Sequence, residues 1–424
     1  MVRELKHTEI GDIPVDWKIQ TFEETFKIFS NNTLSRENLN NRGGFVRNIH
    51  YGDILTHFSE VLKCNEVEIP YINDLSLLSS SAQLVQDGDL IIADTAEDET
   101  VGKATEIQGL GNGKLVAGLH TIPCRVKKGD FAPGWLGYYM NSHMYHDQII
   151  PFITGIKVSS ISKSAIAGTL IVIPPKKEQQ MIVDALKEVD YEIETIKFLL
   201  HKKELIKYGL LQILLDSNDE NKNFKRSWIQ EKLMDVTTKI GVGLATSVTE
   251  HYRTTGVPIF RNLNIKENYL DDEDILFLDE SFAAKNPNKV IHTGDVLTVH
   301  TGYVGTSCVV PEKYDGAMTF TTLITSTKKD VLLPEYLAYH LNSPFGRKEV
   351  ENLQASGGRN NLNVGDFEQY RIAFPSDIDE QKKIVTILQD VDKEIEATRL
   401  KLEKQKKIKV GMISDLITGK IRLV

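Results

Sequence analysis

LGYYMNS at residues 136–142 and LAYHLNS at residues 337–343 are two versions of one sequence, 201 residues apart. The same offset relates IVIP at residues 171–174 to IAFP at residues 372–375. A period of about 200 residues is far longer than the 20–50 residues of a solenoid repeat. The chain is therefore predicted to contain one domain twice rather than a stack of short repeats.

The duplication extends in both directions from these stretches. Further matches, in the same order in both halves, are Trp17 with Trp228, Arg47-Asn48-Ile49 with Arg261-Asn262-Leu263, Gly88-Asp89-Leu90 with Gly294-Asp295-Val296, Glu178-Gln179 with Glu380-Gln381, and Asp190 with Asp392. Chance is a poor explanation for so many matches in one order. A chain of 424 residues has room for two such copies.

Each copy begins with a turn-rich part. Short β-type runs, such as residues 90–93 and 296–299, lie between Gly, Asp and Asn turns. Helical stretches, such as residues 135–142 and 335–342, interrupt these runs. This mixture predicts an α+β domain with an irregular sheet.

Each copy ends in one long helix. Apolar residues recur there at spacings of four and three, which is the heptad pattern of a coiled coil. The positions are Ile182, Leu186, Val189, Ile193, Ile196 and Leu200 in the first helix, and Ile384, Leu388, Val391, Ile395 and Leu402 in the second. Thr398 and Gln405 interrupt the second seam, so we expect it to be weaker. Ser376 with Asp379 resembles a capping box at its start.

These patterns divide the chain into six parts. They are an N-terminal segment at 1–17, a globular domain at 18–174, a long helix at 175–217, a polar linker at 218–227, a second globular domain at 228–375 and a second long helix at 376–424. The fold class is α+β, with an internal pseudo-twofold repeat. Two apolar seams in one chain most simply pack against each other.

Composition narrows the class of protein. Hydrophobic residues make up 41% of the chain and charged residues 26%, as in soluble globular proteins. No apolar run approaches the ~20 residues that span a bilayer, and the polar start at residues 1–10 is unlike a signal peptide. Cys64, Cys124 and Cys308 lie too far apart for a disulfide framework or a metal knuckle. A reducing cytoplasm is the expected location.

The two ends of the chain carry the most specific motifs. TEIGDIPVDW at residues 8–17 and LITGKIRL at residues 416–423 resemble the signatures of type I restriction-modification specificity subunits. A globular domain followed by a helix that opens with Glu-Gln, repeated once, resembles the architecture of that family across the whole chain. One departure is visible: the family often repeats the Thr-Glu-Ile-Gly stretch between its halves, and here only Trp228 remains of it.

The resemblance implies a function and a set of partners. In that family the two helices pack antiparallel and hold two target-recognition domains apart, and each domain reads one half of a split DNA sequence. The helices are expected to set the length of the unread gap between the two half-sites. The helices also dock two copies of a modification subunit, which uses S-adenosylmethionine to methylate adenine. Restriction subunits that use ATP with Mg²⁺ join the larger complex. This chain is therefore expected to bind double-stranded DNA and to have no catalytic centre, metal or cofactor of its own.

The motifs of catalysis are incomplete. Asn286-Pro287-Asn288 lacks the second proline and the aromatic residue of an adenine methyltransferase motif, and residues 109–113 do not have the spacing of a cofactor-binding glycine loop. The acidic runs at residues 97–99 and 271–274 could hold a nuclease metal, but solvated loops explain them better. An enzyme with its own site and a non-DNA adaptor, built of duplicated modules on a helical rod, remain the alternatives.

The charge balance is unusual for a DNA-binding protein. Residues 18–174 contain 13 Lys and Arg against 17 Asp and Glu, and residues 228–375 contain 14 against 19. Because DNA binding follows local rather than net potential, a basic face is still compatible with these counts. The excess of acid suggests that much of the phosphate contact comes from the modification subunits.

Candidate base or phosphate contacts are cations, amides and imidazoles in turn-rich segments. They are Arg42, Arg47, Lys157, Arg261, His300, Arg359, Asn360 and Asn361. For Arg47 and Arg261 a structural role, in salt bridges within each domain, is an equally good interpretation.

Overall fold

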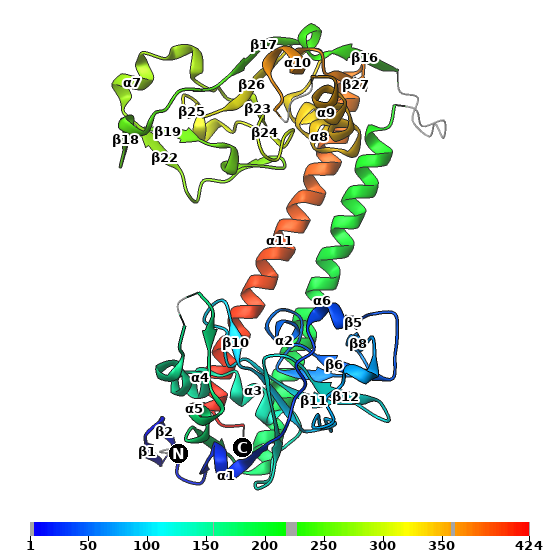
Figure 1. Cartoon of the computed structure of the whole chain (residues 1–424). Helices are drawn as coiled ribbons and strands as arrows, with labels where there is room; N and C mark the ends of the chain where they lie inside the picture. The colour runs from blue at the N-terminus through cyan, green and yellow to red at the C-terminus, as the bar shows by residue number, and fades with distance from the viewer. Residues whose placement is uncertain (1–3, 156, 218–226, 358–360, 424) are drawn as a thin grey trace. The chain divides into compact units, whose positions relative to one another are not determined.

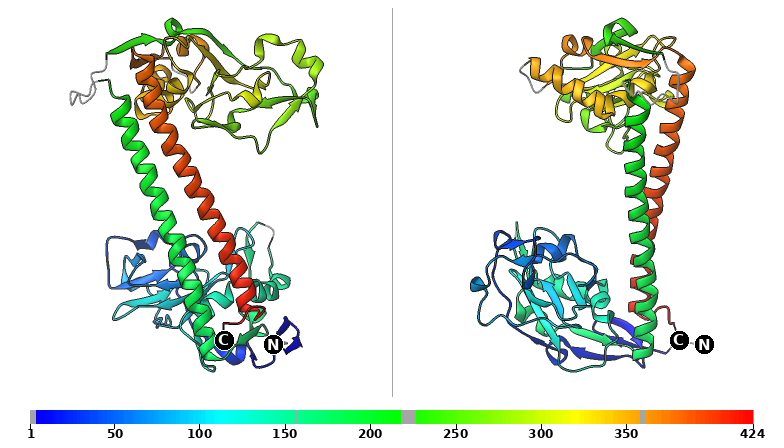
Figure 2. Two further views of the ribbon diagram at one scale, coloured as in Figure 1. Left: turned by 180° about the vertical axis from the view of Figure 1, so that it is seen from behind. Right: turned by 90° about the vertical axis from the view of Figure 1, so that its right-hand side faces the viewer.

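The computed structural model describes residues 4–155, 157–217, 227–357 and 361–423. The chain forms two compact units: residues 1–196 with 401–424 form unit 1, and residues 197–400 form unit 2 (Figures 1 and 2). Each unit contains one globular domain and a segment of both long helices. The predicted α+β class and the duplicated domain–helix architecture are confirmed.

The globular domain of unit 1 is built on two sheets. The larger has the strand order β4-β13-β9-β11-β7 and the smaller β12-β6-β8-β5. The bounds of the larger are β4 Phe26–Ile28, β13 Thr121–Val126, β9 Leu90–Ala93, β11 Ala104–Gln108 and β7 Val61–Lys63. Those of the smaller are β12 Lys114–Ala117, β6 Val46–Ile49, β8 Tyr71–Ile72 and β5 Leu39–Asn40. Three two-stranded pairs accompany them: β1 Leu5–Thr8 with β2 Gly11–Pro14, β3 Lys18–Thr21 with β15 Leu170–Ile173, and β10 Thr95–Ala96 with β14 Ser159–Ser160.

The globular domain of unit 2 repeats this topology. Its sheets have the orders β17-β26-β23-β24 and β25-β19-β22-β18, which match the two sheets of unit 1 without the edge strand β7. The first comprises β17 Thr237–Val242, β26 Thr322–Thr327, β23 Val296–Val299 and β24 Ser307–Val309. The second comprises β25 Met318–Thr319, β19 Val257–Phe260, β22 Leu276–Leu278 and β18 Tyr252–Arg253. The pairs are β16 Trp228–Lys232 with β27 Arg371–Pro375, and β20 Ile265–Lys266 with β21 Tyr269–Leu270.

Strand register shows which residues correspond. Lys18 faces Ile173 in one unit, and Ile229 faces Phe374 in the other, so Trp17 and Trp228 occupy the same place. The match of Arg47 with Arg261 is wrong. In unit 1, Ile49 at the end of β6 pairs with Ala117 of β12, and in unit 2, Phe260 at the end of β19 pairs with Thr319 of β25. Ile49 therefore corresponds to Phe260, and the next residue, His50, corresponds to Arg261. A three-letter motif is too short to align segments whose intervening loops differ in length.

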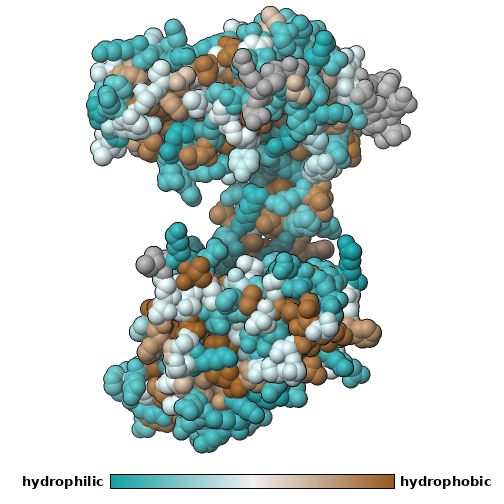
Figure 3. All heavy atoms as spheres, in the orientation of Figure 1, coloured by the Kyte–Doolittle hydropathy of each residue, from teal (hydrophilic) through white to brown (hydrophobic). Residues whose placement is uncertain are grey.

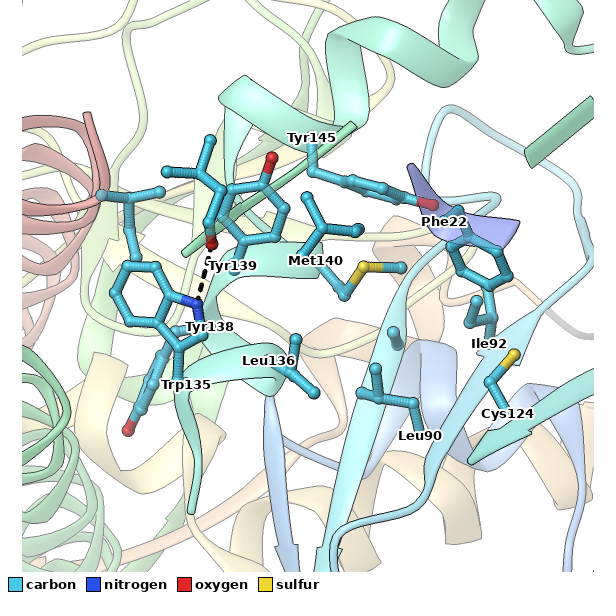
Figure 4. Close-up of a cluster of buried hydrophobic side chains, with 14 of the residues drawn as sticks. Phe22, Leu90, Ile92, Cys124, Trp135, Leu136, Tyr138, Tyr139, Met140 and Tyr145 are labelled. Carbon is cyan, nitrogen blue, oxygen red and sulfur yellow. Dashed lines mark hydrogen bonds between the residues drawn. The ribbon is translucent and has the colours of Figure 1, made fainter. Parts of the chain in front are cut away.

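The first five residues of the repeated heptapeptide, 136–140, lie on a buried helix. Helix α3, Trp135–Met140, is buried at every position, and the indole of Trp135 donates a hydrogen bond to the Val172 carbonyl (Figure 4). In the figure the side chains of Leu136 and Met140 face those of Leu90 and Ile92 from strand β9. The matching helix α8, Pro334–Asn342, is buried at every position except Glu335. Sheet and long helix therefore pack on opposite sides of this element, which is why its sequence survives in both copies.

The remaining short helices complete the two domains. In unit 1 they are α1 Phe22–Thr25, α2 Tyr51–Thr56, α4 His143–Ile149 and α5 Lys163–Ala167. In unit 2 they are α7 Glu280–Ala284, α9 Pro344–Gly357 and α10 Val364–Glu368. A 3-10 turn, η6 Asn262–Asn264, stands in unit 2 where α2 begins in unit 1.

The long helices are α6, Lys176–Leu215, and α11, Ile378–Ile417. They run antiparallel within each unit: Glu192 contacts Gln405 in unit 1, and Lys203 contacts Glu394 in unit 2. All but two of the predicted seam residues are buried, and Leu200 and Val391 are half-buried. Thr398 is buried in the seam and satisfies its hydroxyl on the Glu394 carbonyl of its own helix. The capping box at Ser376 is wrong, because Asp377 accepts the hydrogen bond from the Asp379 amide.

A buried glutamine attaches each domain to the start of its long helix. The Gln179 amide donates to the carbonyls of Asp130 and Pro174 and accepts from the Ala132 amide. Gln381 makes the same three bonds with the corresponding groups of Val331, Pro375 and Leu333. We call this set of bonds the glutamine latch of each unit.

The two terminal motifs meet in unit 1. Arg422 pairs with Asp16, at 2.9 Å, and with the buried carboxylate of Glu178, which also accepts from the Trp17 indole at 2.9 Å. Gly419 has a positive φ of 71°, and a Cβ there would lie 2.5 Å from the Pro14 ring. The glycine of LITGKIRL is thus required by close packing against the N-terminal motif. No described helix is long and apolar enough to cross a membrane.

Candidate nucleic-acid interface

Three loops converge at one edge of the globular domain in unit 1. The amide of Asp94, just after β9, donates to the His120 carbonyl, and the Asp94 carbonyl accepts from Ile161. The Thr95 hydroxyl lies 3.2 Å from the His120 ring, and Tyr51 at the start of α2 packs edge-on against it. We call the described residues of the loops 94–100, 118–121, 154–155 and 157–160 the loop edge of unit 1.

Unit 2 has a loop edge in the corresponding place. It consists of residues 300–305, 320–322 and the described residue Asn361. The carbonyl of His300 accepts from the Leu362 amide at 3.0 Å, which repeats the bond between Asp94 and Ile161. Asn262, the counterpart of Tyr51, donates to the Thr301 hydroxyl and accepts from the Thr322 hydroxyl. Two domains with different loop sequences therefore use one framework to bring the same three segments together.

Both loop edges contain a strained residue at the same position. His120 has φ 53° and Thr321 has φ 48°, in the left-handed region that glycine normally occupies. Asn268 is the other non-glycine residue with positive φ in the described part of the chain. A β-branched residue such as Thr321 pays about 1–2 kcal/mol for this backbone. Strain that recurs at one position of two diverged copies indicates a shared function rather than an accident of either sequence.

The predicted residues divide between the loop edges and the rest of each domain. Lys157 is exposed in the 154–160 hairpin, and His300 and the exposed Asn361 lie on the loop edge of unit 2. Arg359 and Asn360 lie outside the described residues. Arg42 is exposed in the loop between β5 and β6, and its backbone amide donates to the Asn40 side chain. Within the described part of the chain no contact joins it to the loop edge.

The two arginines of the short motif have structural partners. Arg47 donates to the Cys64 carbonyl at 2.7 Å, and Arg261 donates to the Asp274 carbonyl at 2.9 Å. These partners are backbone carbonyls rather than the carboxylates that we expected. Arg261 is nonetheless next to Asn262 of the loop edge, whereas Arg47 points toward the end of β7.

The histidines of the loop edges differ in exposure. His300 is half-buried, and this burial lowers the pKa of its ring, so that the imidazole is neutral at pH 7. A neutral ring offers one donor and one acceptor, which suits a base edge better than a phosphate. His120 is 47% exposed and lies 3.3 Å from Asp94. Sequence reasoning missed His120 and Thr321, because a left-handed φ at a residue other than glycine leaves no mark in the sequence.

The acidic runs contain no clustered ligands. In the described part of the chain, no three His, Cys, Asp or Glu side chains lie together as a metal site would require. Asp98 accepts from the Thr100 hydroxyl, which lowers the pKa of the Asp98 carboxyl, and Asp272 pairs with Lys313 and Tyr314. All three contacts are at the exposed surface, as expected for solvated loops.

The outer face of α6 is unusually apolar for an exposed surface. Hydrophobic side chains are visible on the helices among hydrophilic ones (Figure 3). In unit 2 the exposed members on α6 are Phe198, Leu199, Leu205, Ile206, Tyr208 and Ile213, with Phe198 71% exposed. We call these six residues the apolar face of α6. Three of the matching positions on α11 are apolar and exposed as well, namely Leu400, Ile408 and Val410. Lys401, Lys407 and Asp415 occupy the other three, so the surface of α11 is the more charged of the two.

Comparison with known proteins gives one consistent result. The family model described as the type I restriction modification DNA specificity domain matches residues 14–205 and again residues 225–405. A chain assigned in Methanocaldococcus jannaschii as the MjaX specificity subunit of a type I restriction enzyme is 23% identical over 99% of this chain and 96% of its own length. The EcoKI specificity subunit of Escherichia coli is 23% identical over 59% of this chain and 57% of its own length.

Solved structures agree on the fold. A chain from a study of the assembly and conformational transition of a type I restriction-modification system superposes with a TM-score of 0.62, covering 96% of this chain and 99% of that one, at 14% identity. The specificity subunit from M. genitalium superposes with a TM-score of 0.56, covering 98% and 99%, at 13% identity.

Proposed function

This chain belongs to the type I restriction modification DNA specificity family, and from that premise we propose how it selects DNA. Each globular domain is a target-recognition domain that reads one half of a bipartite sequence. The loop edge of each unit supplies the base contacts. The observation that carries this assignment is the duplicated loop edge, with a strained left-handed residue at the same position in both copies.

The loop edges are suited to reading bases more than to binding phosphate. They offer a hydroxyl, an amide and imidazoles at Thr301, Asn361, His120 and His300, which are groups that pair with base edges. The acidic run at residues 97–99 opposes phosphate binding. Phosphate contacts are therefore assigned mainly to the partner subunits, and specificity becomes a property of the assembled complex.

The chemistry belongs to the partners. Modification subunits provide S-adenosylmethionine-dependent methylation of adenine, and restriction subunits provide the ATP- and Mg²⁺-dependent steps. The apolar face of α6 is the proposed docking surface for a modification subunit, since exposed apolar patches of this kind mark protein interfaces. A second modification subunit on the pseudo-equivalent face of α11 would meet a more basic surface.

Mapping methylated adenines tests the central claim. The chain is co-expressed with an adenine modification subunit from the same kind of system in a host without other adenine methylation. We expect methylation at one split sequence, with two specified half-sites and an unspecified gap, that disappears when this chain is omitted. An unsplit target, or methylation that does not depend on the chain, contradicts the proposal.

Glycine substitutions test the loop edges. Thr321→Gly relieves the strain of the left-handed backbone, which is worth about 1–2 kcal/mol, but glycine costs ~0.5–1 kcal/mol of conformational entropy on folding. The variant should therefore be as stable as the wild type or slightly more stable. We expect it to lose discrimination in one half-site, and His120→Gly in the other. Asn268→Gly is the matched control, because Asn268 has the same backbone conformation away from the loop edges. Unchanged half-sites in the first two variants would refute the assignment.

A further inference from the structure

Each recognition domain is fastened to both long helices by the same three side chains. In unit 1 the hydroxyl of Tyr138, on α3, donates to Oδ2 of Asp190 on α6 at 2.6 Å. Oδ1 of the same carboxylate lies 2.7 Å from the ammonium of Lys409 on α11. We call this set joint 1.

Unit 2 contains the same arrangement. Tyr339, on α8, donates to Oδ2 of Asp392 on α11 at 2.7 Å, and Oδ1 of Asp392 lies 2.5 Å from the ammonium of Lys207 on α6. We call this set joint 2. In both joints the aspartate comes from the helix that follows the domain, and the lysine comes from the other helix. Each long helix therefore contributes an aspartate to one joint and a lysine to the other.

The joints are largely shielded from water. The side chains of Lys409 and Lys207 are 15% and 17% exposed, and those of Asp190 and Asp392 are both 28% exposed. In such surroundings a charged hydrogen bond is stronger and less screened than at the surface. One carboxylate that is held simultaneously by a phenol and an ammonium restricts the angle between the domain and the helix pair.

The two joints are unequal. In joint 1 the ammonium of Lys409 also binds both carboxylate oxygens of Glu60, at 2.7 and 2.8 Å, so the domain has a second tie to the helix pair, made directly to α11. Among the described residues, Lys207 of joint 2 pairs with Asp392 and with no carboxylate of its domain. Joint 2 also borders a cavity of about 1420 Å³ in unit 2, lined by Asn268, Tyr269 and Arg347 among others. Within the part of the chain that the structure describes, joint 2 thus has one ion pair to its recognition domain fewer than joint 1, and open space lies beside it.

We propose that the Tyr–Asp–Lys joints determine how strictly the gap between the half-sites is measured, and that joint 2 is where tolerance for a different gap resides. This rests on the proposed function. Adding one base pair shifts a half-site by ~3.4 Å and rotates it by roughly 34°, so a domain must pivot on the helices to follow it. A stiff joint opposes the pivot, whereas a joint without its tyrosine hydroxyl permits it. Tyr138 and Tyr339 are positioning residues that need not touch DNA.

Tyr339→Phe is the decisive variant. It removes one hydroxyl and leaves Asp392 paired with Lys207, so no buried charge loses its partner. Adenine methylation is mapped in the complex of full-length chain and modification subunit. We expect methylation at sites with the gap changed by one base pair to rise about tenfold relative to the wild-type gap, the effect of losing one hydrogen bond to a charged group. Both half-sites should stay the same.

Tyr138→Phe is the matched control. Glu60 still ties the domain of unit 1 to Lys409, so this variant should keep the strict gap. In the double variant Tyr138→Phe with Glu60→Gln, the gap should relax as it does for Tyr339→Phe. A role in stability alone would lower methylation at all sites and leave the distribution of gaps unchanged.

The outcomes separate this inference from the proposed function. If the wild-type chain directs no methylation of a split target, the proposed function fails. If it does, and Tyr339→Phe shows the wild-type distribution of gaps, the joint proposal is overturned while the function stands. A loss of thermal stability in Tyr339→Phe with unchanged gaps at the remaining methylated sites also overturns it.

Discussion

Gln179 and Gln381 show how one buried side chain determines where a domain ends and a helix begins. Each amide is fully buried and uses two donors and one acceptor on backbone groups of its own domain. Removing the amide takes this partner from three backbone groups, of which some are buried and the others partly buried. The Glu-Gln dipeptide that marks the start of each helix in the sequence is therefore a structural feature.

We expect Gln381→Leu to destabilise unit 2 by about 3 kcal/mol, because orphaned buried groups cost ~1–3 kcal/mol each and part of that is regained by relaxation. Urea unfolding followed by circular dichroism measures the loss. Gln180→Leu, at an exposed position one residue beyond the latch of unit 1, is the control and should change stability by less than ~0.5 kcal/mol. A latch variant as stable as this control would mean that water replaces the lost bonds.

His340 makes unit 2 sensitive to acid. It is buried in α8 with Nδ1 2.8 Å from the Tyr370 hydroxyl, and burial lowers the pKa of its ring from 6.5 to about 4. At a pH between these two pKa values, the His340 ring is protonated in the unfolded chain and neutral in the folded chain. Stability from this group is complete above pH ~6.5 and is lost as the pH falls toward about 4.

We expect the free energy of unfolding to fall by about 2 kcal/mol between pH 7.5 and pH 5, because it falls by about 1.36 kcal/mol for each pH unit below 6.5. Urea unfolding at both pH values measures it. His340→Phe removes the titrating group and should lose less stability over the same range, even if it is less stable at pH 7.5. Equal pH dependence in the two proteins would contradict the assignment. Position 139 in the other copy is Tyr, so unit 1 lacks this source of acid sensitivity.

At the scale of elements, the long helices combine two demands on one sequence. The seam must be apolar toward the partner helix, and under the proposed function the outer face must remain available for docking a modification subunit. On α6 the seam and six exposed outer positions are apolar, whereas α11 has Lys401 and Lys407 at two of the matching outer positions and Thr398 within its seam. The weaker pattern on α11 still forms a helix of 40 residues, because the seam of α6 packs against it.

Inserting one heptad into each helix, after Phe198 and after Leu400, lengthens both by ~10 Å while it keeps the seam in register. We expect the preferred gap to widen by roughly three base pairs at ~3.4 Å each, with both half-sites unchanged. Mapping of methylated adenines gives the new gap. Insertion of three residues at the same places breaks the heptad and should abolish folding of the coil. Altered half-site sequences after the heptad insertion would show that the helices do more than set distance.

At the scale of the whole molecule, duplication makes recognition modular. Each unit has its own core, latch, joint and loop edge, so the sequence read by one domain need not depend on the other. Residues 18–174 are attached to the helices through the β3–β15 pair, the glutamine latch and joint 1. A domain that preserves these three attachments is expected to function in the same place.

Exchange of residues 18–174 for the corresponding domain of another family member should replace one half-site and leave the other and the gap intact. The measurement is again the methylated sequence. The control exchange keeps Tyr138 and Glu60 of this chain in the incoming domain, since joint 1 needs both. If both half-sites change together, the domains do not read DNA independently.

The sequence by itself determined the architecture. The offsets of 201 and 202, the heptads and the terminal motifs predicted two α+β domains on two helices, because periodicity and duplication are properties of the order of residues. They did not identify the loop edges. Lys157, His300 and Asn361 were found there, but Arg47 was not, and its match with Arg261 was wrong by three positions.

Only the tertiary structure decided which residues act together. His120 and Thr321 became recognisable through a backbone angle, and the joints through contacts between residues as distant as Tyr138, Asp190 and Lys409. Such contacts depend on how loops of different length fold back onto a common sheet, and on which faces two helices turn toward each domain. A linear pattern reports the periodicity of each element, whereas these sites exist only where separate elements meet.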